Sequence, residues 1–216
     1  MGGYCYHVLN RGNGRATVFH EDEDYAAFVR LLAEAGERAA MRTLAYCLMP
    51  DHFHLVVWPA QDGDLSRWMQ WLMTSHVRRY HGRYGGSGHV WQGRFKAFPI
   101  AEDGHLLTVC RYVERNPLRA DMVQRAEDWQ WSSLANPRGP ELGLSLAKGP
   151  VPRPRNWRAL VNKPQTDAEE EALRRSVARG APYGSPSWMA ETAAALGLES
   201  TLRARGRPRK GEEAER

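Results

Sequence analysis

Two histidines spaced two positions apart are the first residues of this sequence that suggest a chemistry. His52-Phe53-His54 opens an apolar run with the composition of a strand. Because strand side chains alternate, both imidazoles would lie on one face while Phe53 enters the core. Two adjacent imidazoles can bind one divalent cation. A pair is nevertheless short of a full ligand set and also suits two half-exposed strand histidines.

A tyrosine and an asparagine four positions apart form the second candidate constellation. Residues at i and i+4 share one face of a helix, so Tyr112 and Asn116 would point the same way. A phenol beside a metal-bound phosphate can attack phosphorus, and the amide oxygen of Asn116 suits a hard cation. The alternative is that Tyr112 packs in the core and Asn116 caps a helix that ends before Pro117.

Four basic side chains in the same part of the sequence are candidate DNA contacts. Arg94 and Lys96 share one face of a predicted strand, and a sheet core cannot hold both unpaired. Arg78 and Arg79 lie on a long predicted helix, interleaved with aromatic residues on which unpaired bases can stack. The alternative for that helix is a solvated basic face that covers a sheet.

A basic run near the C-terminus is a further candidate. Arg205-Gly206-Arg207-Pro208 resembles an AT-hook, whose arginines enter a narrow minor groove. We therefore expect Arg205 and Arg207 to bind DNA, with a solvated basic tail as the alternative.

The composition narrows the classes of function. The 216 residues carry a formal net charge of +5, largely from arginine, and such a surface attracts polyanions. No apolar run reaches the ~18 residues of a membrane span. The three cysteines form no CxxC pair, which favours a reducing, cytoplasmic and nucleoid-associated location over a disulfide framework or a cysteine zinc site. The sequence contains no Walker motif, so we expect no nucleotide cofactor.

The elements that must position these residues follow from hydrophobic periodicity. Their order is βαββαβ followed by a helix, which is the α+β, ferredoxin-like arrangement with one added helix that carries Tyr112. We expect an antiparallel sheet with the third strand in a central position, and a last helix that stops near Pro117. The predicted strands span 4–10, 43–49, 52–58 and 90–100, and the predicted helices span 22–39, 64–84 and 103–115.

The chain divides into three segments by composition. Residues 1–135 hold the predicted catalytic domain, and 136–165 form a proline-rich linker or wrapping arm. Residues 166–216 form a small extension with predicted helices at 166–179 and 187–196, followed by the basic tail.

Taken together, the motifs resemble those of the REP-associated tyrosine transposases, which are single-tyrosine transposases of the HUH superfamily. The resemblance covers about residues 4–133 and implies a ferredoxin-like HUH fold. It implies that His52 and His54 are metal ligands, Tyr112 is the nucleophile and Asn116 is a helix-borne ligand. The motifs that carry it are Tyr6-His7-Val8, Arg11-Gly12, Met49-Pro50-Asp51-His52-Phe53-His54, Trp91-Gln92-Gly93-Arg94-Phe95-Lys96 and Tyr112-Val113-Glu114-Arg115-Asn116-Pro117.

The resemblance also implies a substrate and a reaction. The substrate would be single-stranded DNA folded as an imperfect palindromic hairpin. Mg²⁺ or Mn²⁺ would polarise the scissile phosphate, and attack by Tyr112 would give a 5′-phosphotyrosine and a free 3′-OH. The phosphodiester energy is kept for rejoining, so no ATP is required. A monomer is favoured over a dimer.

Two other functions fit the same sequence. One is a non-catalytic regulator that binds hairpin DNA on this fold. The other is a ferredoxin-like RNA-binding module in which sheet aromatics stack on bases. Neither needs Tyr112 and Asn116 to face His52 and His54, so the convergence of those four side chains discriminates between the functions.

Overall fold

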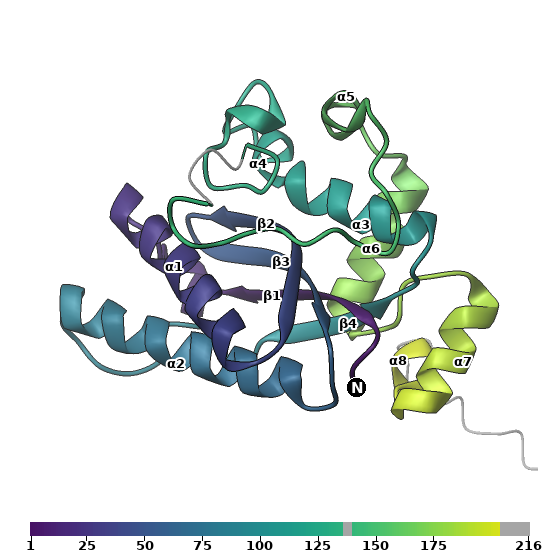
Figure 1. Ribbon diagram of the computed structural model, residues 1–216, viewed down its shortest axis with the longest axis horizontal. Coiled ribbons are helices and arrows are strands. Elements are labelled where there is room, and N and C mark those ends of the chain that lie inside the picture. The colour runs from purple at the N-terminus through teal and green to yellow at the C-terminus, as the bar shows by residue number, and fades with distance from the viewer. Residues whose placement is uncertain (136–139, 204–216) are drawn as a thin grey trace, which may run out of the picture.

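A four-stranded antiparallel sheet forms the centre of the protein (Figure 1). The computed structural model describes residues 1–135 and 140–203, so Arg205 and Arg207 lie outside the described residues. The strand order is β2-β3-β1-β4, with β3 between β2 and β1, as the ferredoxin-like prediction requires. The strands are β1 (Cys5–Arg11), β2 (Met41–Met49), β3 (His52–Pro59) and β4 (Lys96–Ile100).

Helices cover both faces of this sheet. The helices α1 (Asp22–Arg38) and α2 (Asp64–Tyr84) pack on one face, where Phe53 is buried. The helix α3 (Gly104–Glu114) packs on the other face, together with Val56. Because alternate residues of β3 enter opposite cores, His52 and His54 lie on the α3 face.

The fourth strand is shorter than its sequence predicts. The predicted strand 90–100 is a strand only from Lys96, while Trp91 makes a single bridge to Gly12. Gly93 has a φ of +66°, a left-handed conformation that interrupts an extended strand. The alternation argument that placed Arg94 and Lys96 on one strand face was therefore wrong for Arg94, which precedes the strand.

The helix that carries Tyr112, α3, ends at Glu114, close to the predicted stop near Pro117, but a second short helix follows it at once. The short helix α4 (Asn116–Arg119) follows α3 directly, with Pro117 in its first turn. A proline is tolerated there because the first helical N–H groups have no intrahelical acceptor. Backbone bonds from Arg115 N to Arg111 O (2.9 Å) and from Arg119 N to Arg115 O (2.9 Å) keep the two helices in one path.

The proline-rich arm packs on α3. The buried Glu114 accepts hydrogen bonds from Trp157 Nε1 (2.6 Å) and Ser133 Oγ (2.5 Å), and Arg153 lies 3.0 Å from the same carboxylate. Beyond the arm, the two predicted helices of the extension are present. The remaining elements are the 3₁₀ turns η1 (Asn13–Arg15) and η2 (Ala126–Asp128) and the helices α5 (Trp157–Asn162), α6 (Asp167–Arg179), α7 (Pro186–Leu196) and α8 (Glu199–Leu202).

The extension also reaches the edge of the sheet. Tyr183 N donates to Pro99 O (2.9 Å), and Ala101 N donates to Tyr183 O (2.9 Å), so this segment lies against β4. The limits of the three segments remain a prediction. None of the helices in the described residues is both long and apolar enough to span a bilayer.

Candidate active site

A cavity of about 480 Å³ lies on the α3 face, at the end of the sheet where β1 ends and β3 and β4 begin. It brings together both candidate histidines, the candidate nucleophile, the candidate amide ligand and two of the predicted DNA contacts. The lining residues are Leu9, Asn10, Arg11, His52, His54, Gln92, Arg94, Lys96, Tyr112, Asn116, Arg119, Ala120 and Val177.

The two histidines lie side by side on β3 and face the tyrosine on α3. The ring centroids of His52 and His54 are 5.1 Å apart, and those of His54 and Tyr112 are 5.8 Å apart. The register that pairs Arg11 with His52 brings the end of β1 to the same place. Side chains alternate along β3, which puts both histidines on the face where α3 packs. The site is therefore built from residues about 60 positions apart in the sequence.

Each candidate ligand histidine has one ring nitrogen already occupied. His54 Nδ1 lies 2.9 Å from Nε2 of the buried His7, and His52 Nδ1 bonds the carboxylate of Asp51. These contacts leave Nε2 of each ring as the nitrogen available to another ligand. An imidazole held at one nitrogen by a carboxylate or other acceptor is typical of metal-binding histidines.

The surroundings favour neutral imidazoles. Burial lowers the pKa of His54 well below its usual value, and the nearby His7, His52, Arg119 and Arg11 lower it further. Burial also lowers the pKa of His52, although the hydrogen bond and charge of Asp51 oppose this shift. The pKa of His7 falls to about 3 because of burial. A neutral imidazole is the form that can ligate a metal.

Tyr112, Asn116 and Arg119 lie on successive turns of the α3–α4 path. Arg119 Nη2 donates to the phenol oxygen of Tyr112 (3.0 Å) and lies 3.4 Å from Asn116 Oδ1. The guanidinium carbon of Arg119 is also 4.3 Å from the centroid of the Tyr112 ring, a cation–π arrangement. Tyr112 is only 6% exposed, so its ring is fixed by packing while its oxygen borders the cavity.

The donor set fits one divalent cation of mixed nitrogen and oxygen preference. Among residues 1–135 and 140–203, no three His, Cys, Asp or Glu side chains gather as a metal site. The remaining candidate donor is the amide of Asn116, whose buried Nδ2 has no hydrogen-bond partner in the described part of the chain. Rotation of the amide by 180° would present Oδ1 at this position, and the guanidinium of Arg119, which now lies 3.4 Å from Oδ1, would then have to move away from Nδ2. Two imidazoles and an amide oxygen suit Mn²⁺ or Mg²⁺.

The remaining predicted DNA contacts lie elsewhere. Arg78 lines a neighbouring cavity, whereas Arg79 lines neither cavity and lies 3.3 Å from the carboxylate of Glu23. Two other arginines of α2 are also ion-paired, Arg67 with Asp64 and Arg83 with Glu21. Much of the basic character of this helix is therefore neutralised by acidic neighbours.

Several lining residues were missed by sequence reasoning, and three of them show why. Arg119 lies at i+7 from Tyr112 and could have been found only by extending the helix through Pro117. Arg11 ends β1, and its place beside His52 depends on strand register. Val177 comes from α6, and no local pattern in the sequence indicates that this helix reaches the cavity.

Known proteins share sequence with this chain over roughly its first half. The family model described as "Transposase IS200 like" matches residues 2–116. A REP-associated tyrosine transposase of Haemophilus influenzae is 30% identical over 109 residues, which are 45% of this chain and 61% of the relative. The chain therefore spans less than two thirds of that relative's length.

One solved structure shows the same fold. It is described as a REP-associated tyrosine transposase bound to a REP hairpin and has a TM-score of 0.51 and 17% identity, covering 69% of this chain and 92% of that one. A transposase of Deinococcus radiodurans R1 has a TM-score of 0.39 and 18% identity, covering 53% and 94% of the two chains. The family model covers more than half of the sequence and includes both histidines, Tyr112 and Asn116. The chain belongs to the family of IS200-like transposases.

Proposed function

We propose that this protein is a metal-dependent endonuclease and strand transferase for single-stranded, REP-like palindromic hairpins. The observation that carries the proposal is the convergence of His52, His54, Tyr112 and Asn116 in one basic cavity. The REP hairpin bound to the structural neighbour supports the choice of substrate. All four side chains come from one chain, so the proposed site needs no residue of a second copy.

Cations around the cavity would bind the DNA backbone. Lys96 and Arg94 are exposed beside the tyrosine, and Arg119 and Arg11 complete a ring of positive charge. Arg11 is partly balanced by Asp51 at 3.7 Å, whereas the Arg119 guanidinium is directed at the phenol oxygen. Arginine can bind two phosphate oxygens at once, so these groups can fix a scissile phosphate against Tyr112.

His52, His54 and Asn116 would hold the divalent cation. The cation supplies Lewis-acid polarisation of the phosphate and neutralises charge in the transition state. His7 and Asp51 hold Nδ1 of the two imidazoles, so Nε2 of each would be the ligating atom.

Tyr112 would then form the covalent link. The phenol loses its proton as its oxygen attacks phosphorus, and the Arg119 guanidinium stabilises the developing phenolate. The new Tyr–O–P bond replaces the bond from phosphorus to the 3′-oxygen, which leaves with a proton as a 3′-OH. Attack by another 3′-OH on the phosphotyrosine forms a new bond from phosphorus to a 3′-oxygen and breaks the Tyr–O–P bond. The proton of that 3′-OH goes to Tyr112, which returns as a free phenol.

The RNA-binding alternative loses its structural basis. That function needs an open sheet face carrying aromatics. Both faces of this sheet are covered by helices in the described residues, and Phe53 and Phe98 are fully buried.

A covalent-adduct assay tests the proposal. Labelled single-stranded hairpins copied from the DNA flanking the gene are incubated with the protein and Mn²⁺ or Mg²⁺, then denatured. The wild type should yield a nick and a denaturation-resistant adduct. Tyr112→Phe removes one oxygen and should abolish both while hairpin binding persists. A wild type that binds these hairpins but never forms the adduct would instead be a hairpin-binding regulator.

A further inference from the structure

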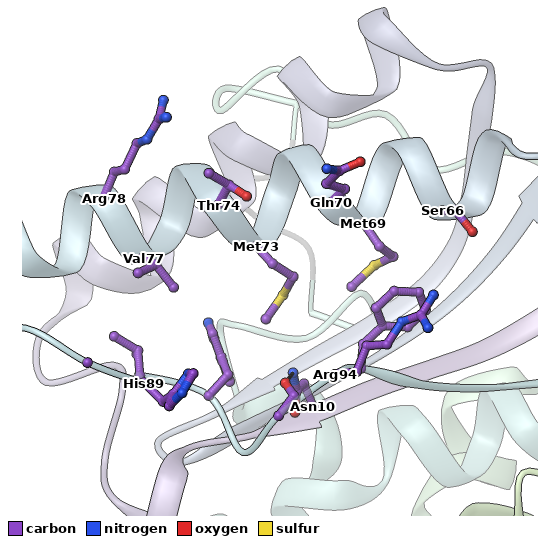
Figure 2. Close-up of a pocket in the computed structure, with 15 residues that line it drawn as sticks. Asn10, Ser66, Met69, Gln70, Met73, Thr74, Val77, Arg78, His89 and Arg94 are labelled. Carbon is purple, nitrogen blue, oxygen red and sulfur yellow. Dashed lines mark hydrogen bonds between the residues drawn. The ribbon is translucent and has the colours of Figure 1, made fainter.

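A second cavity of about 630 Å³ lies on the opposite side of the sheet end, between α2 and the segment before β4. Figure 2 shows Met69, Met73 and Val77 extending from α2 toward the segment that carries His89 and Arg94. Trp91 and Phe95 add aromatic surface to the lining. The volume is within the ~300–1,000 Å³ that small-molecule sites have.

This cavity adjoins the candidate active site. Asn10 and Arg94 line both cavities. Asn10 Nδ2 donates to Gly93 O (3.3 Å), which ties the segment before β4 to the end of β1. Gly93 turns the chain with its positive φ, and the exposed Arg94 therefore lies at the junction of the two cavities.

We propose that this second cavity is a nucleobase site, which binds one unpaired base next to the scissile phosphate. The proposal rests on the proposed function, because the strand held at Tyr112 supplies the base. Arg94 would bind the phosphate between the two cavities. A single DNA strand could then place its backbone in the candidate active site and one of its bases in the second cavity.

The chemistry of the lining matches a base better than an aliphatic ligand. A base has two apolar π-faces and a polar edge, so it needs flat apolar walls and hydrogen-bonding groups at the mouth. The thioether of the half-buried Met73 is polarisable and makes favourable contacts with aromatic rings, whereas Met69 is fully buried. The exposed Gln70 and His89 offer donors and acceptors at the rim. Only an unpaired base has its edge free to meet them.

The test separates base reading from cleavage by using the Tyr112→Phe protein, which binds without forming the phosphotyrosine. The probe is a pool of one hairpin copied from the gene's own flank, with the unpaired nucleotides on both sides of the stem randomised. Bound DNA is sequenced to give the base preference at each unpaired position. We expect one position to show a preference of about 10-fold or more, because a wrong base leaves hydrogen-bonding groups unpaired at a cost of ~1–3 kcal/mol.

Met73→Trp, introduced into the Tyr112→Phe protein, fills the cavity. It should abolish the base preference at the one preferred nucleotide position and at no other. Affinity for the stem and preferences elsewhere should stay within about 2-fold, since the basic cavity is untouched. Met189→Trp on α7 is the matched control, because Met189 is also half-buried on a helix but lines neither cavity. Met73→Ala is the second variant if the larger side chain impairs folding, and should weaken the same preference.

An unchanged preference profile in both Met73 variants would overturn the proposal. So would a uniform loss of affinity across all positions, or a starting protein without any base preference. The adduct assay is independent of these results. If the wild type forms no adduct but the Met73 variants lose the base preference, the catalytic function is rejected and the base site is kept. If the wild type forms the adduct but the Met73 variants keep the base preference, the base site alone is rejected.

Discussion

Removal of the Arg119 guanidinium should impair the chemical step far more than DNA binding. Arg119 Nη2 is 3.0 Å from the Tyr112 oxygen, where negative charge develops as the phenol attacks. Loss of one such donor costs ~10²–10³ in rate, or ~2.7–4 kcal/mol. Arg11, Arg94 and Lys96 remain in the cavity, so hairpin affinity should fall much less.

The assay is single-turnover nicking of a labelled hairpin by Arg119→Ala at saturating protein. Added guanidinium ion should recover part of the lost rate, because the substitution leaves a space beside the Tyr112 ring that matches the missing group. Arg119→Lys should be intermediate, since it keeps the charge and loses the planar fork. The control is Arg174→Ala, which removes an exposed i,i+4 ion pair on α6 and should leave the rate unchanged. A nicking rate for Arg119→Ala within about 3-fold of wild type, far below the loss expected for an oxyanion donor, would refute the role of Arg119.

The remaining predictions concern the metal, the tail and acid stability. His52→Ala and His54→Ala should lose nicking and keep most hairpin binding, and chelator should abolish wild-type nicking until Mn²⁺ or Mg²⁺ is restored; full activity in chelator would rule out the metal role. Removal of residues 203–216 should weaken hairpin binding and flatten its salt dependence, because fewer counterions are released; an unchanged salt slope would make the tail a solvated end. Burial lowers the pKa of His76 from 6.5 to about 4, so the unfolded chain binds this proton first and folding stability should fall as pH drops from about 6.5 to 4. Urea unfolding should show that the free energy of unfolding falls less between pH 7 and pH 5 for His76→Gln than for wild type. An equal fall for both proteins would contradict the buried neutral state of His76.

The local patterns of the sequence predicted the fold and the centre of the site. The alternation around Phe53 correctly placed His52 and His54 on one sheet face, because one side of β3 must enter the core under α1 and α2. The helical spacing of Tyr112 and Asn116 correctly placed them on one face of the α3–α4 path. These inferences needed only backbone periodicity.

What the sequence did not predict depends on contacts between distant segments. His7 meets His54 as a diagonal neighbour across β1 and β3, and that pairing follows from a register that neither strand encodes alone. The strand before Lys96 was predicted too long because Gly93 adopts a left-handed turn that hydrophobic pattern does not reveal. Arg119 was missed because Pro117 indicates a helix end, whereas here it begins a new helical turn.

The central claim is that Tyr112 forms a covalent bond with DNA, and mass spectrometry of the adduct tests it most directly. Wild-type protein is incubated with a hairpin from its own locus and divalent metal, denatured, and digested with protease and nuclease. The account predicts that a nucleotide phosphate remains attached to the peptide containing Tyr112, at that side chain, with the cut strand ending in a 3′-OH. A nucleotide attached to any other residue, or a nick without an attached nucleotide, would contradict it.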